Sequence, residues 1–164
     1  GTLTYSAYGQ FVDQFEPIVT PQPAQRSGGA RLEYTDATDW SLGGSYQAAE
    51  DRGQWRHLVG VDGLWRRGPV ELMGEATVED AAQHGQNQWG LYLQSVFELW
   101  APLYLVTRYE HYEVQHGGPP NNLFVGGFAY KPTPFLVLKL EYLAADHPAE
   151  ESPSGFKSSI AVLF

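Results

Sequence analysis

The heptapeptide LVLKLEY, Leu136–Tyr142, decides the fold, because its side chains alternate between apolar and charged. In an extended strand, successive side chains point to opposite faces. The leucines and Tyr142 therefore share one face, and Lys139 and Glu141 lie on the other. A period of two predicts a β-strand with one apolar face.

The same period continues through most of the chain. The best helical candidate, Glu75–Gln83, is short and polar. We therefore predict an all-β domain over residues 1–164, an antiparallel up-and-down transmembrane β-barrel. Its strands are expected near residues 2–12, 29–36, 40–48, 54–66, 69–79, 87–99, 102–114, 122–131, 134–145 and 155–164.

Composition excludes several classes of protein. Hydrophobic residues make up 43% of the chain and charged residues 18%, which argues against disorder. The net charge of −9 argues against nucleic-acid binding, which needs clustered Lys and Arg. The absence of Cys excludes disulfides and thiolate metal sites. No metal-ligand spacing or cofactor motif occurs, so we expect no metal, no cofactor and no catalysis.

The connections between these strands are expected to alternate strictly between long and short. The short ones are Thr35–Asp39, Arg66–Pro69, Trp100–Pro102 and Lys131–Pro134. The long ones are Asp13–Gly28, Ala49–Gly53, Glu79–Gln86, Gln115–Asn121 and Asp146–Ser154. Outer-membrane barrels have short periplasmic turns and longer outer loops. An even number of strands then places both termini in the periplasm.

A soluble barrel or sandwich also alternates, so the period alone leaves the environment open. No apolar run approaches the roughly 20 residues of a membrane helix, and the other structure that spans a bilayer is a closed barrel. Aromatic residues occur where strands meet connections, as expected at a lipid–water interface. They are Trp40, Trp55, Trp65, Trp89, Trp100, Tyr130 and Tyr142. The connection order and these aromatics favour the membrane barrel.

The last strand, GFKSSIAVLF, resembles the C-terminal assembly signal of Gram-negative outer-membrane proteins. The signal is a terminal aromatic preceded by apolar residues at alternate positions, and Ser158 is a small exception here. The matching residues are Phe156, Ile160, Val162 and Phe164. The resemblance implies recognition by the barrel assembly machinery during biogenesis.

A narrower resemblance covers roughly residues 91–164. The segments LVTRYEHY, FAYKPTPFLVLKLEY and SGFKSSIAVLF look like the C-terminal strands of general and phosphate-selective (O/P-type) porins. Such porins have about sixteen strands and are often trimeric, and about sixteen strands leave an aqueous channel. The chain departs from them in its length and its few lysines, which argues against phosphate selectivity.

Charged residues opposite the apolar positions are expected to face the barrel lumen. They are Arg31, Glu33, Arg56, Asp62, Glu71, Glu75, Glu98, Arg108, Glu110, Lys139, Glu141 and Lys157. Opposite charges on neighbouring strands can pair. We expect Arg56 to pair with Glu71 or Glu75, and Arg108 with Glu141. The lumen is then either a salt-bridged interior or a charged constriction, in which the acid excess favours cations weakly.

These observations lead to a porin-like passive channel in the bacterial outer membrane, either a complete small barrel or part of a larger one. Its expected partners are the lipid bilayer, lipopolysaccharide, and other copies or an envelope complex. One alternative is a closed structural or adhesive barrel acting through its outer loops. Another is an omptin-like rim protease using Asp146 and His147, with His84 and His116 in neighbouring loops.

Overall fold

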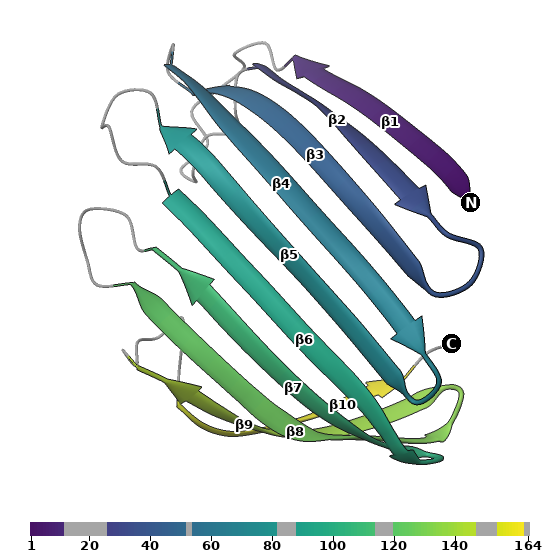
Figure 1. Cartoon of the computed structure of the whole chain (residues 1–164). Coiled ribbons are helices and arrows are strands. Elements are labelled where there is room, and N and C mark those ends of the chain that lie inside the picture. Colours follow the sequence, from purple (N-terminus) through teal and green to yellow (C-terminus); the bar gives the residue numbers. More distant parts are fainter. Residues whose placement is uncertain (12–25, 52–53, 82–87, 114–119, 147–153, 163–164) are drawn as a thin grey trace. The chain divides into compact units, whose positions relative to one another are not determined.

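The computed structural model describes residues 1–11, 26–51, 54–81, 88–113, 120–146 and 154–162. Ten β-strands make up nearly all of this part (Figure 1). They are β1 (Thr2–Phe11), β2 (Arg26–Thr35), β3 (Trp40–Asp51), β4 (Gln54–Arg67), β5 (Val70–Ala81), β6 (Gln88–Trp100), β7 (Leu103–Tyr112), β8 (Asn121–Thr133), β9 (Leu136–Ala145) and β10 (Gly155–Val162). All ten predicted strands are confirmed, with ends displaced by a few residues.

The strands form one antiparallel sheet in sequence order, β1-β2-β3-β4-β5-β6-β7-β8-β9-β10. Each strand lies beside the one that precedes it in the chain, so the up-and-down order is confirmed (Figure 1). In the described residues, β1 and β10 are the edges, and the sheet is not closed into a barrel. The sequence predicted a β-barrel, either complete in this chain or part of a larger one, and the described strands form an open ten-stranded sheet.

The sheet contains two compact units, which we describe separately. Unit 1 comprises Gly1–Gly63 and Ala76–Trp89, and unit 2 comprises Leu64–Glu75 and Gly90–Phe164. No helix in the described ranges combines the length and the hydropathy required for crossing a membrane.

Four short turns join strands where the sequence predicted them. Asp36 N–H donates to the Trp40 carbonyl across the β2–β3 turn at 2.8 Å. Gly68, with φ of 56°, starts the β4–β5 turn, where glycine adopts a left-handed conformation at little cost. The prediction of a long connection at Ala49–Gly53 is wrong. β3 continues to Asp51 and β4 starts at Gln54, so only two residues separate the strands.

The buried hydrophobic cluster is small. Among the described residues, the hydrophobic side chains that are buried are Leu123, Val125, Ala129 and Leu143. Leu123, Val125 and Leu143 pack together where β8 begins and β9 ends, and the partly buried Ala145 packs against them. A soluble sheet normally buries one whole apolar face against another layer, and this cluster does not do so.

Candidate functional site

The strand register separates an apolar face from a polar face. In unit 2, Leu93 lies opposite Tyr109, and Tyr109 lies opposite Phe124. The next row joins Gln94 to Arg108. Because side chains alternate along each strand, these two rows point to opposite sides of the sheet. We call the side of Leu93 the apolar face and the side of Arg108 the polar face.

The charged residues predicted from the sequence share the polar face of each unit. In unit 1, Arg31 of β2 contacts Asp62 of β4. Glu33 is two residues from Arg31 on β2, and Arg56 is six residues from Asp62 on β4, so each lies on the same face as its neighbour. In unit 2, the set follows from the β6–β10 register and from the contact of Met73 with Gln94. Its members are Glu71, Glu75, Glu98, Arg108, Glu110, Lys139, Glu141 and Lys157.

Exposure is inverted relative to a soluble sheet. On β8, the apolar-face residues Phe124 and Phe128 are 57% and 48% exposed, whereas Val125 on the polar face is 4% exposed. On β2, Leu32 is 53% exposed, while the neighbouring Arg31 is half-buried. On β8 and β2 the apolar face is therefore the more exposed one, which is the reverse of the usual arrangement in water. On β9 and β10 the polar-face residues Lys139 and Lys157 are exposed as well.

In unit 1, an ion pair joins two strands across a third. Arg31 on β2 donates to both carboxylate oxygens of Asp62 on β4, at 2.5 and 2.7 Å. The pair passes over Gly43 of β3, where an added Cβ would lie 2.5 Å from the Arg31 guanidinium and 2.7 Å from the Asp62 carboxylate. The missing side chain at Gly43 makes room for this bidentate contact, which fixes the geometry of both partners.

Two predicted pairings are wrong in their partners. Arg56 lies 3.6 Å from the carboxylate of Glu79, where Glu71 or Glu75 was expected. Arg108 lies 2.7 Å from Glu110 on its own strand, where Glu141 was expected. The register explains the second case, because Arg108 lies opposite Val125. Glu141 of β9 lies opposite Gly127, which is two residues along β8 from Val125. Arg108 and Glu141 are therefore on strands that are not neighbours and are also offset by two residues.

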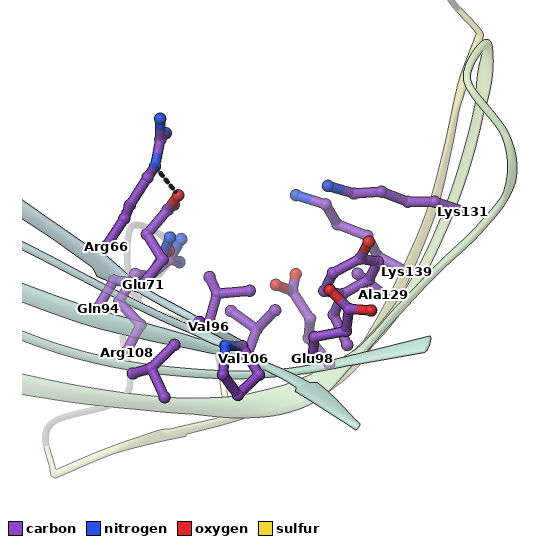
Figure 2. Close-up of a pocket in the computed structure, with 15 residues that line it drawn as sticks. Arg66, Glu71, Gln94, Val96, Glu98, Val106, Arg108, Ala129, Lys131 and Lys139 are labelled. Carbon is purple, nitrogen blue, oxygen red and sulfur yellow. Dashed lines mark hydrogen bonds and ion pairs between the residues drawn. The ribbon is translucent and has the colours of Figure 1, made fainter. Parts of the chain in front are cut away.

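Unit 2 has a cavity of about 370 Å³ on its polar face, near the short turns. Figure 2 shows Arg66, Glu71 and Arg108 on one side of it, and Lys131 and Lys139 on the other side. Its charged lining consists of Arg66, Glu71, Glu98, Arg108, Lys131, Lys139 and Glu141. Four of these residues are basic and three are acidic, so the acid excess of the predicted set is reversed in this cavity.

Small side chains create the cavity floor. Val96 of β6 lies opposite Val106 of β7, and Val106 lies opposite Gly127 of β8. Ala129 is the next residue on the same face of β8. Figure 2 shows Val96 and Val106 between the two charged walls. The floor residues Val96, Val106 and Ala129, with Gly127 beside them, leave the space that larger residues would fill.

Two basic residues of the cavity were missed. Arg66 and Lys131 end the predicted strands 54–66 and 122–131 and begin two of the predicted tight connections, and neither was among the charges expected to face the lumen. In the structure, Arg66 belongs to β4 and Lys131 to β8. The Lys131 ammonium lies 4.7 Å from the centre of the Tyr104 ring, a cation–π contact. Arg66 is four residues after Asp62, and Lys131 is two residues after Ala129. Because alternate residues of a strand share a face, this spacing would have placed both side chains on the polar face.

The aromatic residues predicted for a membrane interface are exposed and lie at or near strand ends. In unit 1 these are Trp40, Trp55 and Trp89, and in unit 2 they are Trp65, Trp100, Tyr130 and Tyr142. Three of the four residues that match the assembly signal, Phe156, Ile160 and Val162, are exposed on the apolar face of β10. The fourth, Phe164, lies outside the described residues.

Polar groups on the apolar face gather at the strand ends next to the longer connections. In unit 2, Tyr109 and His111 each contact the Asn122 amide oxygen, at 2.8 and 2.7 Å. Asp146 accepts from the Asn122 backbone N–H and side-chain amide, at 2.8 and 2.5 Å. Asp146 therefore holds β8 to the end of β9. The rim histidines His84, His116 and His147 lie outside the described residues.

In the ranges that the structure describes, no group of three or more His, Cys, Asp or Glu residues is arranged to hold a metal ion. Comparison with known proteins gave no matching family model, no matching curated protein and no matching solved structure.

Proposed function

We propose that this chain forms the wall of a transmembrane β-barrel in a bacterial outer membrane, and that the barrel is a porin-like passive channel. The inverted exposure carries the proposal, because apolar faces that present Leu32 in unit 1, and Phe124 and Phe128 in unit 2, are stable against lipid tails and costly in water. The proposed surroundings are the bilayer and, on its outer side, lipopolysaccharide.

The dimensions of the strands support this assignment. The ten strands contain 8 to 14 residues. A strand needs about 9 to 11 residues to cross a bilayer when it is tilted. Tryptophan and tyrosine near the strand ends suit the two interfaces, where an apolar ring meets lipid and its polar group meets water.

The open edges set a requirement for this proposal. Unpaired backbone groups cost several kcal/mol each in the bilayer core, so spanning strands occur in closed barrels. In the membrane, β1 and β10 would therefore each need a strand partner. The polar face would then line the interior, with its charges partly neutralised by the Arg31–Asp62, Arg66–Glu71 and Arg108–Glu110 pairs.

Reconstitution into planar bilayers tests the channel. We expect stepwise conductance increases when the purified chain inserts, because the polar face carries unneutralised charge that holds water. Weak ion selectivity is expected, since both signs of charge line the cavity of unit 2. Protein that inserts and leaves the bilayer ion-tight would contradict the channel and favour a closed structural barrel.

A further inference from the structure

The cavity of unit 2 holds charged groups of both signs for which the described residues supply no ion-pair partner. Arg66 pairs with Glu71, and Arg108 with Glu110. In the described part of unit 2, the structure shows no ion pair for Lys139, Glu98 or Glu141, although all three line the same cavity.

Glu98 and Lys139 lie in a single row across the sheet. Glu98 lies opposite Tyr104, Tyr104 opposite Ala129, and Ala129 opposite Lys139. Three interstrand spacings separate the backbones of Glu98 and Lys139, about 14 Å along the sheet. Figure 2 shows the Lys139 side chain beside Lys131 on the β8–β9 wall, with Glu98 nearer the floor. The charges of Glu98 and Lys139 are thus held apart, with Tyr104 and Ala129 between them in the row, whereas Glu141 lies two residues from Lys139 on the same face of β9.

We propose that this cavity binds small zwitterionic solutes, namely amino acids and short peptides. The solute carboxylate is held by the ammonium groups of Lys139 and Lys131, and the solute ammonium by the carboxylate of Glu98 across the cavity. The inference rests on the proposed function, because it names the solute class for the water-filled polar face.

The chemistry of the lining favours a zwitterion over a simple ion. A simple anion drawn to Lys139 meets Glu98 and Glu141, and a simple cation drawn to these acids meets two lysines and two arginines. A zwitterion satisfies both signs at once. The Val96 and Val106 floor gives the apolar part of a solute a surface to contact, and about 370 Å³ suits a small solute.

Three forms of one dipeptide test this assignment by calorimetric titration of the folded protein in detergent micelles. We expect alanyl-alanine to bind saturably. N-acetyl-alanyl-alanine lacks the ammonium and alanyl-alanine amide lacks the carboxylate, so each should bind at least about tenfold more weakly, as expected when one charge-assisted contact is lost. Equal binding of the acetylated form would overturn the proposal in favour of a simple anion site. No binding of alanyl-alanine would also overturn it.

Matched variants assign the two ends of the solute. Lys139→Gln should weaken binding of alanyl-alanine about tenfold and should not weaken that of its amide, because the amide is a cation with no carboxylate to lose contact with. Glu98→Gln should do the converse with the acetylated form. Lys157→Gln is the control, since Lys157 has the same charge and the same face but does not line the cavity. An equal effect of Lys157→Gln would overturn the proposal.

The titration is independent of conductance. If the dipeptide fails to bind while the apolar face is shown to meet lipid, the solute assignment fails and the proposed function stands. If the protein does not insert into bilayers at all, the proposed function fails, whatever the titration gives.

Discussion

Gly127→Ala is expected to lower the free energy of unfolding by about 3 kcal/mol, the upper part of the range for overpacking a well-packed site. A Cβ at Gly127 would meet the Leu140 carbonyl oxygen and would lie 2.7 Å from the Glu141 Cα. Both are backbone atoms of β9 and cannot rotate away. The β8–β9 ladder would have to shift, and the floor of the cavity would shift with it.

The adjacent glycine is the matched control for this variant. A Cβ at Gly126 would meet no atom within 4 Å, because that position points outward on the apolar face. Gly126→Ala should therefore change the unfolding free energy by less than about 0.5 kcal/mol, as for an unconstrained surface site. Urea titration of both variants in lipid vesicles, followed by tryptophan fluorescence, measures the difference. Equal losses would contradict the close approach of β8 and β9.

Leu140→Lys is expected to reduce membrane insertion by about 2 to 4 kcal/mol, the cost of a cation on the lipid face of a barrel near the bilayer midplane. Leu140 lies on the apolar face of β9, is 53% exposed, and has polar-face residues on both sides in the chain. In the proposed orientation, its side chain ends among lipid tails. The fraction of protein folded into vesicles over a urea series gives the cost.

Ala161→Lys is the control for added charge, because Ala161 lies exposed on the polar face of the next strand, opposite Val137. There the new ammonium meets water, and the change should be below about 1 kcal/mol. Leu140→Ala separates the loss of apolar surface from the cost of the charge. If both lysine variants insert equally well, the apolar face does not contact lipid.

The strands and their faces could be predicted because both depend on local pattern. In LVLKLEY, Leu136–Tyr142, the alternation alone placed Lys139 and Glu141 on one face, and the β9–β10 register does the same. The up-and-down order followed from short connections, since a turn such as the one at Gly68 leaves the next strand only one neighbour to pair with.

Side-chain partners could not be predicted, because they depend on the stagger between strands. A strand shifted by two residues keeps its faces and changes every partner, so Arg56 pairs with Glu79 without any change in pattern. The prediction of a long connection at Ala49–Gly53 was wrong because it, too, depended on a contact between strands. Its polar residues suggested a loop, yet Glu50 continues β3 and pairs with Arg26 of β2 at 3.6 Å.

The cavity and the edges of the sheet depend on contacts between residues far apart in the sequence. Arg66 and Lys139 line one cavity although 73 positions separate them. Closure of a barrel is equally non-local, since the alternation in β1 and in β10 says that each is a strand and says nothing of which strand lies at its free side. Single-sequence pattern therefore predicted the wall of the proposed barrel, and it predicted neither the solute-sized cavity nor the open edges.

The most direct test of the account compares two adjacent serines of β10. Ser158 lies on the apolar face opposite Leu140, and Ser159 lies on the polar face opposite Lys139. Both are exposed in the isolated chain, and the absence of native Cys makes each single cysteine variant the sole thiol. After insertion into vesicles, we predict that a water-soluble maleimide labels Ser159→Cys and leaves Ser158→Cys largely unlabelled until detergent is added. Equal labelling of both cysteines, or protection of Ser159→Cys alone, would contradict the assignment of the apolar face to lipid.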